Sequence, residues 1–356
     1  HAIVDLGRSS MTKTRVRKPF LRNQDGKGKQ SELQSMVQDE QTLSCSSLTT
    51  EVETITYPDE HAWEKKSTKA RKAVVNKLPS KVAHPSNLAV RTATGAIYIL
   101  LTVVCVLVSD FTTALYLSLL SAICANEFYY MLRADAKLPN ELLGVCAAAL
   151  FPLVMWLFDI SGVCIALAVY ILVLLVWYVF WQPARISDVS VSLFGAVYTG
   201  LIMSTALLLR QSLPEPWGAV LVLGLFVSVW GSDAFAYLVG SAIGKHKLAP
   251  HISPNKSWEG FIAGLIFAMA IWYLLSYIPG VSLTLPQALV FGLINGLAGV
   301  LGDLVESRIK RNSGFKDSGT IMPGHGGLLD RCDSQFLVTL SGAILLVLGG
   351  CIPYVF

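Results

Sequence analysis

Charged residues are scarce in this 356-residue chain. Asp, Glu, Lys and Arg make up 15% of it, hydrophobic residues make up 53%, and the mean hydropathy is +0.55. This composition excludes an ordinary soluble domain, in which about a quarter of the residues are charged. The net charge is only +4, so the composition also gives no reason to expect a nucleic-acid partner.

Cysteine occurs without any pattern that would make it a ligand or a cross-link. The seven cysteines include no CxxC pair and no spacing typical of a metal site. Most of them lie in apolar runs, where a thiol packs as a small hydrophobic group. A signal-peptide apolar region is also missing ahead of the first long apolar run, so we expect no cleavage there.

The first 85 residues differ from the rest of the chain, because they are polar and contain few aromatic residues. We predict a disordered tail over residues 1–85, followed by a transmembrane domain over residues 86–356. Met11 is a candidate natural start, which would make the first ten residues non-native or the product of an upstream start. The basic end of the tail, KKSTKARKAVVNKLPSK, favours either a positive-inside topology signal or contact with anionic lipid head groups.

Long apolar runs fill the remainder of the chain, and a run of about 20 residues can cross a bilayer as a helix. We predict an all-α polytopic membrane protein with about nine transmembrane helices. In the eighth run Gly292 and Gly296 form a G-x-x-x-G pair, which predicts close helix packing. The runs lie near Thr92–Ser109, Phe111–Leu132, Leu142–Phe158, Val163–Trp181, Val189–Leu209, Trp217–Ile243, Phe261–Ile278, Gln287–Leu301 and Phe336–Val355.

Basic residues indicate the orientation, because Lys and Arg collect in cytoplasmic connections. The outer connections of the predicted topology contain only Arg210. This bias predicts an N-in, C-out protein of the cell inner (cytoplasmic) membrane, with a polar active-site loop facing the cytoplasm. The inner connections contain Arg133, Lys137, Arg185, Lys245, Lys247, Lys256, Arg308, Lys310, Arg311, Lys316 and Arg331.

The run SRIKRNSGFKDSGTIMPGHGGLLDRCD, from Ser307 to Asp333, is the most unusual part of the chain. It places acids, bases, a histidine and five glycines between two apolar runs, and Asp303 stands just ahead of it. Carboxylates can hold a divalent cation, basic side chains neutralise phosphate oxygens, and glycines let backbone N–H groups approach them. The run therefore predicts metal-assisted phosphoryl or nucleotidyl transfer, and its membrane setting suggests a phosphorylated lipid as substrate.

A second polar cluster lies around the sixth apolar run. The segment WGSDAFAY contains Asp233, and an acid inside a membrane span is costly enough to mark a functional site. The segment GKHKLAPHISPNKSWEG follows it and forms a basic turn ahead of the seventh run, suited to contact with a triphosphate.

Both clusters resemble the signature of the bacterial-type phosphatidate cytidylyltransferases, the CDP-diacylglycerol synthases. The Ser307–Asp333 run matches S-x-x-K-R-x4-K-D-x-G-x3-P-G-H-G-G-x-x-D-R-x-D, and the upstream segments match S-D-x-x-A-Y, G-K-x-K-L-x-P and S-P-x-K-[ST]-x-E-G. The resemblance covers roughly residues 90–356. One departure is Ser241, where many members carry Lys or Arg.

The resemblance implies a CTP:phosphatidate cytidylyltransferase, which makes CDP-diacylglycerol and pyrophosphate for phospholipid biosynthesis. It further implies magnesium, with a monovalent cation such as potassium as an optional second ion, and a homodimer in the lipid bilayer. Asp303 and Asp330 align with the two aspartates that hold the magnesium, and Asp317 and Asp333 are auxiliary candidates.

Other residues of the two clusters are expected to contact the substrates or to act in catalysis. Lys316 and His325 join Asp303 and Asp330 as catalytic candidates. The expected CTP and phosphatidate contacts are Asp233, Ser253, Asn255, Lys256, Ser257, Lys310, Arg311, Gly326, Gly327 and Arg331.

Two other classes of function stay open on sequence. A CTP-dependent polyprenol or dolichol kinase would transfer the γ-phosphate to a lipid alcohol, although such a kinase is not expected to carry the whole signature run. An ion-coupled transporter could use Asp233 as an ion or proton site. Release of pyrophosphate would distinguish the synthase from the transporter.

Overall fold

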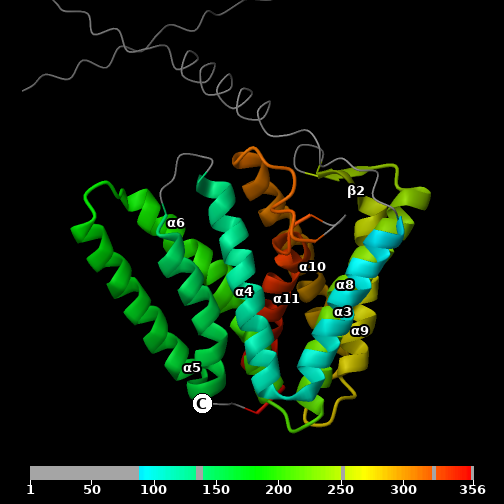
Figure 1. Ribbon diagram of the computed structural model, residues 1–356. Helices are drawn as coiled ribbons and strands as arrows, with labels where there is room; N and C mark the ends of the chain where they lie inside the picture. The colour runs from blue at the N-terminus through cyan, green and yellow to red at the C-terminus, as the bar shows by residue number, and fades with distance from the viewer. Residues whose placement is uncertain (1–87, 134–138, 250–252, 323–325, 354–356) are drawn as a thin grey trace, which may run out of the picture. The chain divides into compact units, whose positions relative to one another are not determined.

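The computed structural model describes residues 88–133, 139–249, 253–322 and 326–353 (Figure 1). The predicted tail over residues 1–85, with its first ten residues, lies outside them, and so does His325. The described part is almost entirely helical, as predicted, with one short antiparallel pair of strands that the sequence analysis did not predict. Its elements are α3 (Leu88–Val108), α4 (Asp110–Arg133), α5 (Glu141–Phe180), α6 (Ile186–Ala196), the π-helical turn η2 (Val197–Leu201), α7 (Ile202–Gln211), α8 (Trp217–Ile243), β1 (Lys247–Ala249), β2 (Ser253–Ser257), α9 (Trp258–Leu275), α10 (Leu285–Asn312) and α11 (Leu329–Leu348).

Seven of the described helical segments are long and apolar enough to cross a membrane: α4, α5, the continuous segment Ile186–Gln211, α8, α9, α10 and α11. The protein is therefore a helical membrane protein. The part of α3 from Thr92 to Val108 is a shorter apolar helix. Length and composition thus support seven spans, which is fewer than the nine that the sequence predicts.

The 40-residue element α5 is a helical hairpin. Its backbone leaves the helical conformation at Asp159 (φ 55°, ψ −160°). The ring centroids of Phe151 and Tyr170 lie 6.3 Å apart, whereas 19 residues of straight helix would separate them by about 28 Å. The two arms of α5 therefore fold against each other (Figure 1). The arms correspond to the predicted runs Leu142–Phe158 and Val163–Trp181.

Helices α10 and α11 reach further than the sequence analysis placed them. The eighth and ninth apolar runs were expected to stop at Leu301 and to begin at Phe336, but α10 continues to Asn312 and α11 starts at Leu329. Gly314 (φ +82°) closes α10, and Phe315 N donates to Lys310 O over 2.9 Å, as in a glycine-terminated helix. The charged ends of the expected loop are therefore helical, so a fixed helix geometry positions their side chains.

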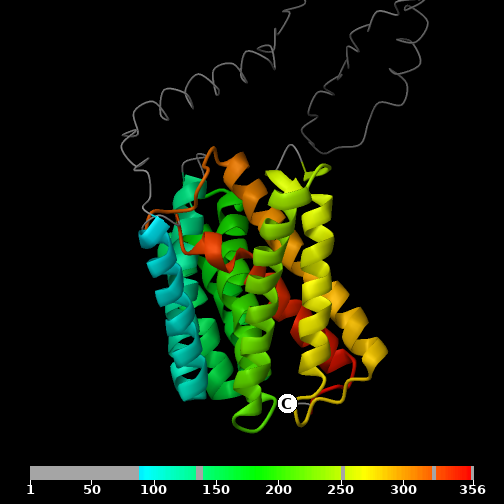
Figure 2. The ribbon, with the colours of Figure 1, turned by 90° about the vertical axis from the view of Figure 1, so that its right-hand side faces the viewer.

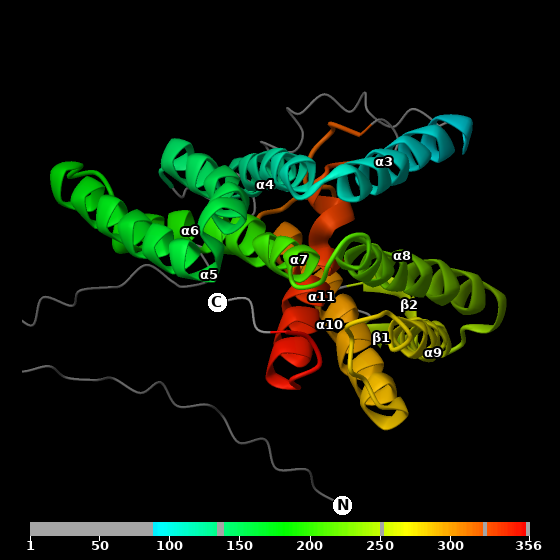
Figure 3. The same cartoon turned by 90° about the horizontal axis from the view of Figure 1, so that it is seen from below.

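Helices α8 to α11 form the part of the bundle that carries the site. In Figure 2, α11 runs obliquely across the neighbouring helices, and Figure 3 shows it beside α10 near the middle of the bundle. The predicted close packing at Gly292 is confirmed, because a Cβ there would lie 2.6 Å from the Cα of Met269 on α9. Buried Asn295 accepts a hydrogen bond from Trp272 Nε1 (3.0 Å) and donates to Val338 O (2.8 Å), joining α10 to α9 and α11.

Candidate functional site

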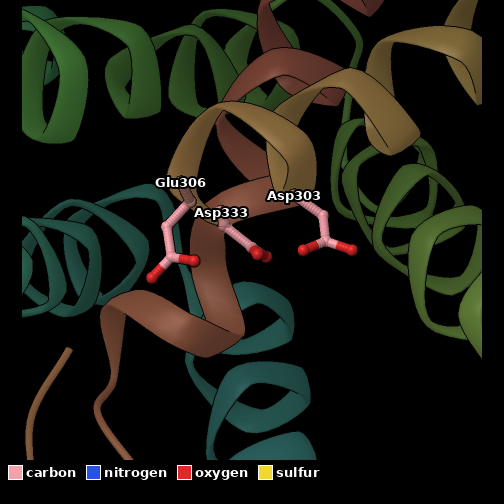
Figure 4. A group of neighbouring side chains, drawn as sticks. All are labelled: Asp303, Glu306 and Asp333. Atoms are coloured by element: carbon pink, nitrogen blue, oxygen red, sulfur yellow. The ribbon is translucent and has the colours of Figure 1, made fainter. Parts of the chain in front are cut away.

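Three carboxylates meet where α10 passes α11. Asp303 and Glu306 lie one turn apart on α10, Asp333 lies on α11, and one carboxylate oxygen from each lies within 4.8 Å of the others (Figure 4). The crossing is close because Gly302 has no side chain: a Cβ there would lie 2.6 Å from the Asp333 carbonyl oxygen. Carboxylates at such short range repel one another unless a cation lies between them.

The burial of these acids also fits a bound cation. Glu306 is fully buried, and apart from its ion pair with Lys310 Nζ (2.5 Å) neither of its oxygens has a hydrogen-bond partner among the described residues. Asp333 is 9% exposed and accepts a hydrogen bond from Ser334 N. Buried charge is stable only when it is paired or bound to metal, and an all-carboxylate donor set suits hard divalent ions such as magnesium. The residues present therefore fit a divalent metal.

Asp330, one of the two expected magnesium ligands, lies outside this group of three. Its Oδ1 forms an ion pair with Lys310 Nζ (2.5 Å), and its Oδ2 accepts hydrogen bonds from Ser318 N and Gly327 N, both at 2.9 Å. These contacts tie the glycine-rich loop, the segment that connects α10 to α11, to the start of α11. Lys310 lies between Glu306 and Asp330 and so connects the three acids to the loop. A metal-binding role for Asp330 stays a prediction. Among the described residues its contacts join Lys310 on α10, the loop and the start of α11.

The upstream cluster lies at the same site. Lys256 at the end of β2 forms an ion pair with Asp303, and the two side chains are 26% and 28% exposed. Asp233 on α8 is accessible and lies within electrostatic reach of Lys256, Asp303 and Arg331. Segments up to 100 residues apart in sequence thus place acids and bases around one accessible region, in the mixture that a metal-triphosphate complex needs.

Several predicted residues have other partners in the structure. Ser257 is buried and caps α9, because its Oγ accepts a hydrogen bond from Gly260 N (3.3 Å). Arg311 donates to Phe315 O (3.1 Å) and so braces the end of α10. These two contacts are structural, and neither side chain needs a substrate to explain its position.

The remaining predicted residues belong to the loop or to β2. Lys316 and the auxiliary metal candidate Asp317 are exposed. Gly326 accepts a hydrogen bond from Met322 N (3.0 Å) through its carbonyl and has φ +86°. The side chains of Ser253 and Asn255, like the whole of His325, lie outside what the structure describes.

Two acidic residues of this region were not predicted from the sequence. Glu306 was not among the metal candidates, although its spacing of three from Asp303 puts both on one helix face once α10 is continuous. Glu127 on α4 was not among the predicted site residues either. It is an acid inside an apolar run, the same signal that drew attention to Asp233.

Comparisons with known proteins agree with this chemistry. A family model described as the cytidylyltransferase family matches residues 89–348. Phosphatidate cytidylyltransferase 5, chloroplastic, of Arabidopsis thaliana is 35% identical in an alignment of 257 residues that covers 63% of this chain and 62% of that protein. Phosphatidate cytidylyltransferases of Staphylococcus haemolyticus and Staphylococcus aureus (strain COL) are 47% and 48% identical over 126 residues, which are 35% of this chain and 48% of each relative. The chain thus spans between about half and three fifths of the length of these relatives.

Proposed function

Since the chain belongs to the cytidylyltransferase family, we propose that it is a CTP:phosphatidate cytidylyltransferase, which makes CDP-diacylglycerol and pyrophosphate. The observation that carries this proposal is the meeting of Asp303, Glu306 and Asp333 beside Lys256 in a membrane protein. The curated relatives named phosphatidate cytidylyltransferase supply the substrate class.

In the proposed reaction a phosphate oxygen of phosphatidate attacks the α-phosphorus of CTP. A new P–O bond forms, the bond from the α-phosphorus to the bridging oxygen breaks, and pyrophosphate leaves with that electron pair. The nucleophile is already an anion at neutral pH, so no activated Ser or Cys is required. Positioning and charge neutralisation therefore carry most of the catalysis.

The residues of the site divide this work. Asp303, Glu306 and Asp333 would hold magnesium, which when bound neutralises phosphate charge and polarises the reacting phosphoryl group. Lys256 and Arg331 would bind phosphate oxygens through charge-assisted hydrogen bonds; the ion pair of Lys256 with Asp303 and the position of both bases within electrostatic reach of Asp233 support this assignment. Lys310 keeps Glu306 and Asp330 in place rather than meeting substrate, because both of its ion pairs are internal. Lys316 and His325 remain proposed phosphate contacts from the loop.

A product assay tests this proposal. Purified protein, phosphatidate, magnesium and CTP labelled in its base should yield a labelled lipid and one pyrophosphate per lipid formed. When a lipid alcohol replaces phosphatidate, a CTP-dependent lipid kinase would instead convert the labelled CTP to soluble CDP and phosphorylate the alcohol, and a transporter would give neither product. Either result would remove the proposed function.

We further propose nine membrane crossings with the amino terminus and the site on the cytoplasmic side of the cell inner membrane, and a homodimer as the assembly. The two arms of α5 and the apolar helix α3 support the larger number of crossings. The one-sided distribution of Lys and Arg supports the orientation. Potassium beside the magnesium is part of the same proposal and rests on the family resemblance alone.

Cysteine labelling tests the orientation. In a background without the native cysteines, Asn312→Cys at the exposed end of α10 should react with a membrane-impermeant maleimide only after the membrane is opened. Ser282→Cys, exposed between α9 and α10, should react in sealed cells and serves as the matched control. Labelling of Asn312→Cys in sealed cells would contradict both the orientation and the use of cytosolic CTP.

A further inference from the structure

Glu127 is a buried acid whose role neither the signature run nor the proposed chemistry explains. It lies on α4, nearly 180 residues before the three acids, and is 4% exposed. No Lys or Arg forms an ion pair with it among the residues that the structure describes. A carboxylate so far from water is costly unless other donors stabilise its charge.

Those donors come from the start of α11 and from the loop before it. Glu127 Oε1 accepts a hydrogen bond from Leu328 N (3.1 Å), and Oε2 accepts from Leu329 N (2.8 Å) and Ser318 Oγ (2.9 Å). The first amides of a helix have no partner within the helix, and Leu328 at the cap position has no side chain that could accept from them. Glu127 supplies that cap from another helix, and the positive end of the helix dipole favours its charge.

The glycine pattern of the loop is matched to this carboxylate. A Cβ on Gly319 would collide with Glu127 Oε1, and a Cβ on Gly327 would collide with Ser318 Oγ and reach Glu127 Oε2. A side chain at either of these two glycines would therefore push the Glu127 carboxylate or Ser318 out of position.

The start of α11 is also where the site is assembled. Asp330 lies in its first turn, and Asp333 lies one turn later against Gly302 of α10. Ser318 Oγ donates toward both Glu127 Oε2 and Asp330 Oδ2, at 2.9 and 3.1 Å. A helix start of this kind would otherwise attract a phosphate group. Because Glu127 already accepts from the amides of Leu328 and Leu329, these two N–H groups are not available to a substrate phosphate.

We propose that Glu127 is a positioning residue: it holds the first turn of α11 and the glycine-rich loop, so that Asp333 meets Asp303 and Glu306. The kinetic part of this proposal rests on the proposed cytidylyltransferase function. The structural part does not, since it concerns only the hydrogen bonds by which Glu127 on α4 fixes the start of α11.

Glu127→Gln tests both parts, because the amide nitrogen of Gln would face backbone N–H donors and cannot accept from them. In hydrogen exchange of the full protein in lipid nanodiscs, the amides of Leu328 and Leu329 should exchange at least about tenfold faster than in the parent. In the product assay kcat should fall by about 10²-fold while KM for CTP changes by less than about threefold, as expected when an interaction is lost at the reacting centre alone.

Asp188→Asn is the matched control. Asp188 is also a buried carboxylate in the first turn of a helix, α6, where it accepts from the N–H of the cap residue Arg185 (2.8 Å). This variant should change neither the exchange of Leu328 and Leu329 nor kcat. If Glu127→Gln does not fold, Gly319→Ala displaces the same carboxylate without removing its charge and should give the same two effects.

The outcomes separate the two proposals. Unchanged exchange at Leu328 and Leu329 would overturn the role of Glu127, whatever the activity. Faster exchange with an unchanged kcat would overturn the kinetic part of the proposal, because α11 would then move without consequence for turnover. A parent protein that makes no CDP-lipid would remove the proposed function, and the exchange comparison would still decide whether Glu127 holds α11.

Discussion

Asp303→Asn should lower turnover by about 10³-fold or more, while the protein remains inserted and folded. The change removes one of three carboxylates that meet within 4.8 Å and leaves Lys256 without its ion-pair partner. Metal-assisted charge stabilisation contributes several kcal/mol to such a transition state, and each 1.4 kcal/mol is about a tenfold change in rate. Formation of labelled CDP-lipid measures turnover, and thermal unfolding in detergent checks the fold.

Glu141→Gln provides the control for this prediction. Glu141 is also a carboxylate in an ion pair with a basic residue, Arg133, but it begins α5 and lies outside the group of three acids. We expect turnover close to that of the parent. If Asp303→Asn retained more than about a tenth of the parental rate at limiting magnesium, Asp303 could not be a metal ligand.

Lys310→Gln should destabilise the protein and abolish its activity. The ammonium group of Lys310 lies 2.5 Å from a carboxylate oxygen of Glu306 and 2.5 Å from one of Asp330, and the residue is only 9% exposed. Removing one partner of a buried ion pair typically costs about 3–5 kcal/mol, because a buried charge is left without compensation. The midpoint of thermal unfolding and the product assay measure the two effects.

A second variant separates the loss of stability from the loss of function. In Lys310→Gln/Glu306→Gln the fully buried carboxylate is neutral, so much of the lost stability should return while the activity stays lost. Arg308→Gln, an exposed basic residue on the same helix, should leave the unfolding midpoint close to the parental value. An unchanged midpoint in Lys310→Gln would show that the two ion pairs do not hold this part of the site.

Much of the fold could be predicted from hydropathy, because the bilayer requires long apolar helices. The run Trp217–Ile243 coincides with α8 at both ends. The ends of α10 and α11 were wrong, because hydropathy detects where a helix leaves the hydrocarbon region and not where its hydrogen bonding stops. Charged residues such as Glu306 and Lys310 continue α10 for eleven residues beyond Leu301. The strands β1 and β2 were missed because a three-residue and a five-residue strand carry little periodic signal.

The class of chemistry could be predicted from the sequence, but the acids that lie together in the site could be predicted only in part. The spacing of Asp303, Asp330 and the basic residues indicated metal-assisted transfer to or from phosphate. Which acids share one cation depends on where α10 crosses α11, and the contact at Gly302 brings Asp333 rather than Asp330 to Asp303 and Glu306. Lys310 then pairs with Asp330, which holds the loop residues Ser318 and Gly327 against the start of α11.

By itself, the sequence determined that this chain is a helical membrane protein of the cytidylyltransferase family, with its acids and bases gathered in two polar clusters. Those properties depend on composition and on the spacing of residues close in sequence, and neither requires knowing which segments meet in the fold. Only the tertiary structure decided that Glu127 caps α11 and that Glu306 joins Asp303 and Asp333. Each of these depends on contacts between helices, and their physical basis is that buried carboxylates and unpaired helix amides must find partners wherever packing places them.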